Sequence, residues 1–162
     1  GNGPWDDRRK GRLVHNTRGG HLIDNAWMKN TDTCPCGRQL AGRPQALAAC
    51  CGRYVDHFDT TPAPDAEHLM RSRYTAFVLE REAYLLATWA ASKRPSRVRF
   101  DAGVKWLGLE VRAFAEPDSD HATVEFVARQ RDTTGRAVRL HERSRFVREN
   151  GRWYYVDGDH LG

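Results

Sequence analysis

Cys34-Pro35-Cys36-Gly37 and Cys50-Cys51-Gly52 are the two short stretches on which the front of this chain depends, and they hold all four of its cysteines. The segment between the two pairs is too short to bury a core of its own, so a cross-link has to hold its ends together. A metal ion or disulfide bonds can supply that cross-link. Adjacent cysteines rarely bond to each other, because the small ring departs from the preferred disulfide geometry.

A zinc ion is the cross-link that this spacing favours. Two thiolates from each of two short turns is the usual construction of a closed tetrahedral site. The predicted ligands are Cys34, Cys36, Cys50 and Cys51. Because four protein ligands leave no open position for water or substrate, we expect the Zn²⁺ to be structural rather than catalytic. Crossed disulfides, free thiols and an iron–sulfur cluster remain alternatives, as does a zinc site in which His57 replaces one cysteine.

A glycine directly follows each cysteine pair. We expect Gly37 and Gly52 to take positive φ values, which would turn backbone amides toward the sulfur atoms. Between the pairs, residues 46–49 are predicted to form a short helical run that ends at the second pair.

A chain of this length normally makes one domain, or one domain plus a small appendage. The chain has 162 residues and a net charge of +5, from 26 basic and 21 acidic side chains. This excess is mild, so it permits a polyanionic partner without requiring one. No apolar run approaches the roughly 18 residues of a membrane span, and no secretory signal is visible. We therefore expect a cytoplasmic protein, in which paired cysteines more often bind metal than form disulfides.

Three segments are predicted along the chain. Residues 1–27 have neither a helical nor a strand period, and we interpret them as a disordered leader or a vector-derived extension before Met28. Residues 28–60 form the cysteine segment. Residues 61–162 form the main domain, which begins with a proline-containing extended linker.

Two helices are predicted at the start of the main domain. Asp65 is a good N-cap, and Glu67 in the first turn is favoured by the helix dipole. Over residues 66–79 the apolar side chains recur at helical spacing. A second helix is predicted over residues 81–91 and ends before Pro95.

After residue 103 the hydrophobic period changes to two, which indicates strands. The predicted strands are residues 106–114, 122–131, 137–147 and 152–157. Asn150-Gly151 favours a type I′ hairpin between the last two strands. That turn sets the pairs Glu149–Arg152, Arg148–Trp153, Phe146–Tyr155 and Ser144–Asp157. Since every connection is of hairpin length, the sheet should be antiparallel and the fold class α+β.

Three blocks of the sequence resemble known motifs. Cys34-Pro35-Cys36-Gly37 with Cys50-Cys51-Gly52 resembles the SEC-C motif, a zinc knuckle also found at the C-terminus of the SecA translocation ATPase. The stretch from Glu67 to Phe77 resembles the signature of the bacterial YchJ-like (UPF0225) family, as do residues 142–146 and 151–155.

The resemblance implies a SEC-C zinc knuckle over residues 28–60 and an NTF2-like (cystatin-like) domain over residues 61–162. In such a domain, helices and a curved antiparallel sheet form a cone that often encloses a pocket. The family is uncharacterised. Some members of the wider superfamily are isomerases, dehydratases or epoxide hydrolases with an inward Asp, His or Tyr, whereas others only bind proteins, so the fold alone does not decide the function.

Glu142 is the residue of the predicted sheet that most invites a functional interpretation. Alternation along its strand places it on the same face as Val138, Leu140, Ser144 and Phe146. This face should point into the cone, and on the predicted register Asp157 shares it. Burial would raise the pKa of Glu142, or an arginine on the first helix, Arg71 or Arg73, would form an ion pair with it.

Two interpretations of this carboxylate follow. In the first, Glu142 or Asp157 is a general base, and Tyr74 or His141 is the proton donor. Alternation argues against His141, because it places this residue on the opposite face from Glu142. In the second, Glu142 and an arginine form a structural ion pair, and this is the interpretation we favour.

The leading hypothesis for function is a protein-binding adapter. The knuckle would dock a protein partner, and the cone would offer a pocket for a small ligand or a sheet face for a homodimer. The first alternative is an isomerase-like or hydrolase-like enzyme acting through the carboxylate in the cone, although we favour a protein that is not an enzyme. The second alternative is nucleic-acid binding through Arg38 and Arg43, which Asp56, Asp59 and the lack of interleaved aromatic residues oppose.

Overall fold

A computed structural model describes residues 28–162, so the leader predicted over residues 1–27 lies outside the described residues. The main domain is α+β, with helices α3 (Ala66–Val78) and α4 (Glu82–Ala87) followed by an antiparallel sheet in the order β3-β4-β5-β6. The strands are β3 (Lys105–Asp118), β4 (His121–Arg131), β5 (Ala137–Glu149) and β6 (Arg152–His160). The predicted fold class and antiparallel sheet are therefore confirmed. Within the described part of the chain, no helix has the length and hydropathy needed to cross a membrane.

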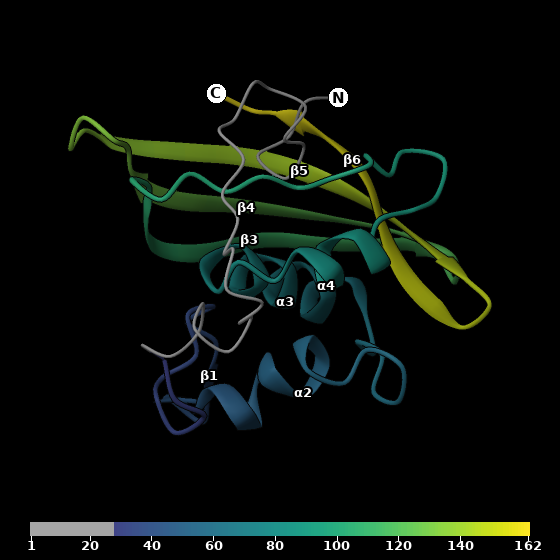
Figure 1. Cartoon of the computed structure of the whole chain (residues 1–162). Coiled ribbons are helices and arrows are strands. Elements are labelled where there is room, and N and C mark those ends of the chain that lie inside the picture. Colours follow the sequence, from purple (N-terminus) through teal and green to yellow (C-terminus); the bar gives the residue numbers. More distant parts are fainter. Residues whose placement is uncertain (1–27) are drawn as a thin grey trace.

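The elements form three layers (Figure 1). Helices α3 and α4 lie against one face of the sheet, and the cysteine segment lies on the side of the helices away from the sheet. This segment contains the hairpin β1 (Gln39–Leu40) and β2 (Arg43–Pro44), the 3₁₀ turn η1 (Leu47–Ala49) and the short helix α2 (Gly52–Val55). Helix α3 is the shared layer, since it contacts α2 on one side and β3, β4 and β6 on the other.

Helix α3 begins where the sequence predicts. The Asp65 side chain accepts a hydrogen bond from the backbone N–H of His68 at 2.8 Å, which satisfies one of the free donors at the helix N-terminus. The apolar face of the helix is buried, with Leu69, Met70 and Tyr74 each 1% exposed. Packing of this face against the sheet, rather than helix propensity, supplies most of the stability of a helix this short.

Aromatic side chains fill the space between helices and sheet. Ring centroids lie 5.5 Å apart for Tyr74 and Trp106 and 5.3 Å apart for Trp89 and Tyr155, and both pairs pack edge to face. Such pairs contribute about 0.5–1.5 kcal/mol beyond the burial of their area. The interior of the domain is thus occupied largely by its own side chains.

Helix α4 ends at Ala87, four residues before the predicted end at residue 91. The backbone that follows pairs with the sheet instead. The N–H of Tyr155 donates to the carbonyl of Thr88, and the N–H of Ala90 donates to the carbonyl of Tyr155, both at 2.8 Å. In this parallel bridge between Trp89 and Tyr155, backbone groups that would form hydrogen bonds within a longer helix form them with β6 instead.

The predicted β5–β6 register is correct near the turn and wrong beyond it. The turn residue Asn150 has a φ of 52°, and the pairs up to Phe146–Tyr155 form as expected. A bulge then shifts the register by one residue, so Asp157 pairs with Arg145, and Ser144 pairs with Gly158. Because a shift of one residue exchanges the two faces of a strand, Asp157 lies on the outer face and not beside Glu142.

Candidate functional site

The four cysteines come together at one point between the cysteine segment and α3. Their Sγ atoms all lie within 4.8 Å of one another, and each of these residues is at most 3% exposed. None of these four cysteines forms a disulfide bond. The Sγ atoms of Cys36 and Cys50 lie 3.6 Å apart, close to the roughly 3.8 Å edge of a tetrahedron with 2.3 Å metal–sulfur bonds. The donor set and its spacing thus suit one four-coordinate metal ion.

Two different properties of glycine help to shape this site. Gly37 has a φ of +73°, as predicted, and the next residue, Arg38, donates its N–H to Cys36 Sγ at 3.5 Å. The prediction for Gly52 is wrong, because this residue begins helix α2 and does not take a positive φ. A Cβ at this position would lie 2.7 Å from the carbonyl oxygen of Leu47, so Gly52 is required by the close approach of two backbone segments.

The sulfur atoms change one another's acidity. Hydrogen bonds from the side chains of Cys36, Cys50 and Cys51 lower the pKa of Cys34 well below that of an ordinary thiol, whereas hydrogen bonds within the same group raise the pKa of Cys36 and of Cys51 well above it. The group by itself therefore does not favour four thiolates, the form that binds metal, and a soft divalent cation such as Zn²⁺ would supply the positive charge that four thiolates require. His57, the alternative ligand, is exposed and does not belong to the metal-ligating group found among the described residues.

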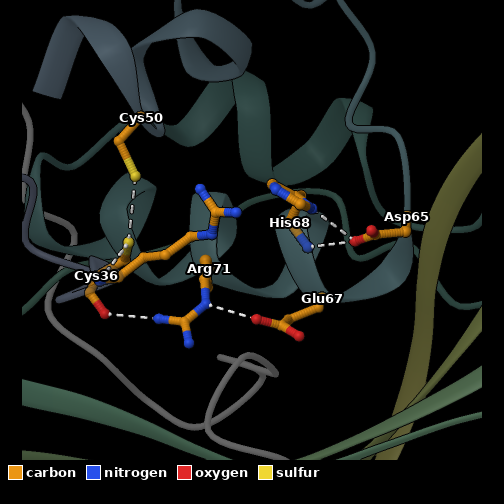
Figure 2. A network of polar contacts seen from close by, with 7 residues as sticks. Cys36, Cys50, Asp65, Glu67, His68 and Arg71 are labelled. Carbon is orange, nitrogen blue, oxygen red and sulfur yellow. Dashed lines mark hydrogen bonds and ion pairs between the residues drawn. The ribbon is translucent and has the colours of Figure 1, made fainter. Parts of the chain in front are cut away.

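Polar side chains of α2 and α3 contact the cysteines, and Figure 2 shows one of them, Arg71 of α3, beside Cys36. Arg71 of α3 donates to the carbonyl of Cys36 and to the carboxylate of Glu67, both at 3.0 Å. The prediction that Arg71 could form an ion pair with Glu142 is therefore wrong. Arg53 of α2 donates to the carbonyl of Cys50 at 3.1 Å, and the hydroxyl of Thr75 lies 3.7 Å from Cys34 Sγ.

No pattern in the sequence predicts that Arg53 and Thr75 contact the cysteines. Arg71 and Thr75 are four residues apart and so share one face of α3. Their spacing marks that face, but it does not show which segment of the chain packs against it.

Glu142 lies in the interior of the main domain, as the alternation of its strand predicts. It is fully buried, and its Oε1 accepts a hydrogen bond from the hydroxyl of Ser144 at 2.7 Å. Burial raises the pKa of Glu142 to about 7, against the opposing effects of the Ser144 hydrogen bond and the positive charge of Arg73. This carboxyl group therefore changes its charge near neutral pH.

Arg73 is also fully buried, but it does not form the predicted direct ion pair with Glu142. Its Nη1 donates to the carbonyl of Leu85 at 2.8 Å, and the guanidinium carbon lies 4.9 Å and 4.7 Å from the ring centroids of Trp89 and Tyr155. Within the part of the chain that the structure describes, Glu142 Oε2 and the Nε and Nη2 atoms of Arg73 are buried without a hydrogen-bond partner, and no ion pair within 4.0 Å joins these two side chains. The two rings and the backbone carbonyl hold the arginine, and its charge acts on Glu142 from a greater distance.

The other catalytic candidates lie elsewhere. Tyr74 is 1% exposed beside Trp106, and burial raises its pKa, which makes it a poor proton donor. Asp157 forms an ion pair with Arg145 on the outer face. His141 also lies on that face, as alternation predicts, with its Nε2 2.8 Å from Glu125 Oε2. The structure therefore brings the four cysteines together but does not bring Glu142 together with Asp157 or His141.

Comparisons with known proteins agree with the fold and with the cysteine motif. A family model described as "YchJ, middle NTF2-like domain" matches residues 65–158. A UPF0225 protein of Polaromonas sp. is 69% identical over 127 residues, which cover 78% of this chain and 91% of the relative. A UPF0225 protein of Bordetella pertussis is 57% identical with the same coverage. The solution structure of a SEC-C motif containing protein from Rhodopseudomonas palustris has a TM-score of 0.67 and 32% identity, over 81% of this chain and 100% of that one.

Proposed function

Since the chain belongs to the YchJ-like UPF0225 family, we propose that it is a cytoplasmic adapter protein built around a structural zinc site. Cys34, Cys36, Cys50 and Cys51 would hold the Zn²⁺ in a SEC-C knuckle, and the knuckle would dock a protein partner. The observation that carries this proposal is the closed, buried group of four sulfur atoms. Four protein ligands leave no position for a substrate, so the ion would support a surface rather than a reaction.

The exposed apolar side chains support a docking role for the knuckle. Leu40 is 56% exposed in the β1–β2 hairpin, which makes it more exposed than Leu107 or Phe114, the other large exposed hydrophobic residues among those described. The hairpin turn is well defined, with positive φ values at Ala41 and Gly42. A leucine presented by a tight turn can act as an aliphatic anchor in a pocket on a partner protein.

The metal can be tested by elemental analysis of the full chain purified under reducing conditions. We expect about one zinc ion per chain, bound by thiolates. A Cys50→Ser variant should lose the ion, because three ligands and a hydroxyl bind zinc more weakly. Purified protein that is folded yet free of any metal would overturn the zinc site.

The docking surface can be tested by in-cell cross-linking followed by identification of the cross-linked proteins. We expect Leu40→Ser to lose a specific partner while the zinc content stays unchanged. Phe114→Ser is the matched control, because it removes a similarly exposed hydrophobic residue from the sheet, at 41% exposure. Equal loss in both variants, or in neither, would contradict docking through the knuckle.

An enzyme acting through Glu142 is the second candidate function. Its pKa of about 7 is in the range of an effective general base at neutral pH. Its complete burial opposes this role, since a substrate would have to displace the side chains that cover it. A small-molecule fragment that shifts the NMR signals of Glu142 and Ser144 would favour the enzyme, whereas fragments that affect only surface residues would favour the adapter.

A homodimer through the outer face of the sheet remains a prediction. That face carries charged pairs, including Arg145 with Asp157 and Asp159 and Glu125 with His141. A dimer interface here would therefore be polar and salt-sensitive. Analytical ultracentrifugation at low and high salt concentrations can test it.

A further inference from the structure

The candidate metal site extends beyond its four cysteines into helix α3 of the main domain. Arg71 holds the carbonyl of Cys36 at 3.0 Å, and the Thr75 hydroxyl lies 3.7 Å from Cys34 Sγ. Thr75 is fully buried, so the sulfur is a hydrogen-bond partner that water cannot replace. Figure 2 shows Arg71 extending from α3 to the first cysteine turn.

The negative charge of a site filled with metal would be stabilised by these contacts. Four thiolates and one divalent cation carry a net charge of −2, and the four cysteines are at most 3% exposed. A buried charge is costly unless nearby groups compensate it. Arg71 and Arg53 each donate to the carbonyl of a cysteine in the group and so place two positive charges at its edge, of which that of Arg71 is paired with Glu67. The Arg71 side chain is only 14% exposed, so water screens its charge weakly.

We propose that Arg71 and Thr75 are outer-sphere residues that determine the affinity of the metal site. Arg71 offsets the negative charge of the metal–thiolate group, and the Thr75 hydroxyl donates a hydrogen bond to the Cys34 thiolate. This proposal rests on the metal site of the proposed function and assigns part of its affinity to the NTF2-like domain. Metal binding would then stabilise α3 on the side that faces the cysteines. On its other side, Arg73 of the same helix packs into the interior against Trp89 and Tyr155.

Glu67 allows an electrostatic role of Arg71 to be separated from a structural one. Its carboxylate binds the same guanidinium group at 3.0 Å and opposes the positive charge of that group. If Arg71 acts through its charge, Glu67→Gln should leave the metal affinity unchanged or increase it. If the Glu67–Arg71 pair only stabilises α3, Glu67→Gln and Arg71→Gln should weaken metal binding equally.

The experiment measures the zinc affinity of the full chain by competition with a chromophoric chelator. Arg71→Gln and Thr75→Val should each weaken zinc binding by about tenfold or more, as is typical when a hydrogen-bond partner of a metal ligand is removed. Thr88→Val is the matched control for Thr75→Val. Thr88 is also buried, at 2% exposure, but its hydroxyl contacts Tyr84 and Arg73 rather than a sulfur atom. This control should retain the wild-type affinity.

A spectroscopic readout complements the affinity measurement. In the Co²⁺-substituted protein, Thr75→Val should shift the thiolate-to-cobalt charge-transfer band, because the hydrogen bond changes the electron density on Cys34 Sγ. Thr75→Ser keeps the hydroxyl and should restore both the band and the affinity. It also preserves the test if Thr75→Val does not fold.

The outcomes separate the two proposals. If the wild-type chain binds neither Zn²⁺ nor Co²⁺, the metal site itself is wrong. If the wild type binds zinc tightly and Arg71→Gln and Thr75→Val bind it equally tightly, only the outer-sphere proposal fails. Equal weakening by Arg71→Gln and Glu67→Gln would overturn the charge-offsetting role of Arg71.

Discussion

The carboxyl group of Glu142 on β5 lies against Gly158 of the neighbouring strand β6, and each residue limits what the other position can hold. A Cβ at position 158 would overlap the carboxylate of Glu142. Gly158 does not have a positive φ, so the requirement for glycine here is one of space and not of backbone conformation. The β5–β6 bulge creates this arrangement, because it pairs Gly158, and not Asp157, with Ser144.

Gly158→Ala should therefore destabilise the protein by about 1–3 kcal/mol, the usual cost of adding a methyl group to a filled interior. The measurement is chemical unfolding at pH 7. In a Glu142→Ala background, Gly158→Ala should reduce the stability much less, because the space occupied by the carboxyl group is then free. Equal costs in the two backgrounds would show that Glu142 is not the group that excludes a side chain at position 158.

Glu142 should also make the stability of the protein depend on pH. Its carboxyl group keeps its proton up to about pH 7 in the folded chain but releases it near pH 4.5 when the chain is unfolded. This contribution is therefore fully present below pH 4.5 and is lost as the pH rises through 7. The shift corresponds to about 3 kcal/mol at 1.36 kcal/mol per pKa unit.

Glu142→Gln should remove this dependence. We expect the variant to become more stable than the wild type as the pH rises from 5 to 8, and to lose that advantage in acid. Unfolding curves of the two proteins over this pH range provide the measurement. The difference between them isolates Glu142 from the carboxyl groups on the outer face. A constant difference at all pH values would contradict a buried, titrating carboxyl group.

Helix α3 is the secondary-structure element that packs against other parts of the chain on two opposite sides. It packs against α2 and the cysteines on one side and against the sheet on the other. Its N-terminus begins directly after the proline-containing linker and relies on Asp65 for its cap.

Asp65→Ala should cost about 0.5–2 kcal/mol of stability, because the backbone N–H of His68 loses its acceptor. Asp65→Asn should cost much less, since asparagine caps helices nearly as well without carrying a charge. Thermal unfolding of the two variants gives the comparison. If both variants lose the same stability, the contribution of Asp65 is its charge near His68 and the helix dipole rather than its hydrogen bond.

At the scale of the whole molecule, the three layers should lose stability together when the metal is removed, and they should still unfold in a single transition. The cysteine segment buries its sulfur atoms against α3, so the proposed zinc would stabilise the main domain as well as the knuckle. A zinc chelator should lower the Tm of the full chain by about 10 °C, as expected for the loss of a ligand present far above its Kd.

The Cys50→Ser variant is the control for this measurement, because it should begin at the lower Tm and show no response to the chelator. Two separate transitions after chelation, with the main domain unchanged, would show that the cysteine segment and the main domain are energetically independent. An unchanged single transition would contradict the structural zinc.

Much of the fold follows from local patterns in the sequence. The helical spacing after Asp65, the period of two after residue 103 and the Asn150-Gly151 turn each act over a few residues, and they predict the elements correctly. The cysteine pairs likewise indicate a shared site, because too few residues separate them for any other means of closure. Local physics suffices for these features, since neighbouring residues carry the whole signal.

Only the tertiary structure decides which of these patterns prevail. Helix α4 ends early because β6 pairs with the backbone after it, and a bulge in β6 moves Asp157 to the outer face. Arg71 binds Cys36 and Arg73 packs against Trp89, although the two arginines are near neighbours on one helix. These choices depend on partners far away in the sequence, whose positions no local period encodes. For the same reason, the cysteines could be recognised as a site from the sequence, whereas the groups that surround them could not.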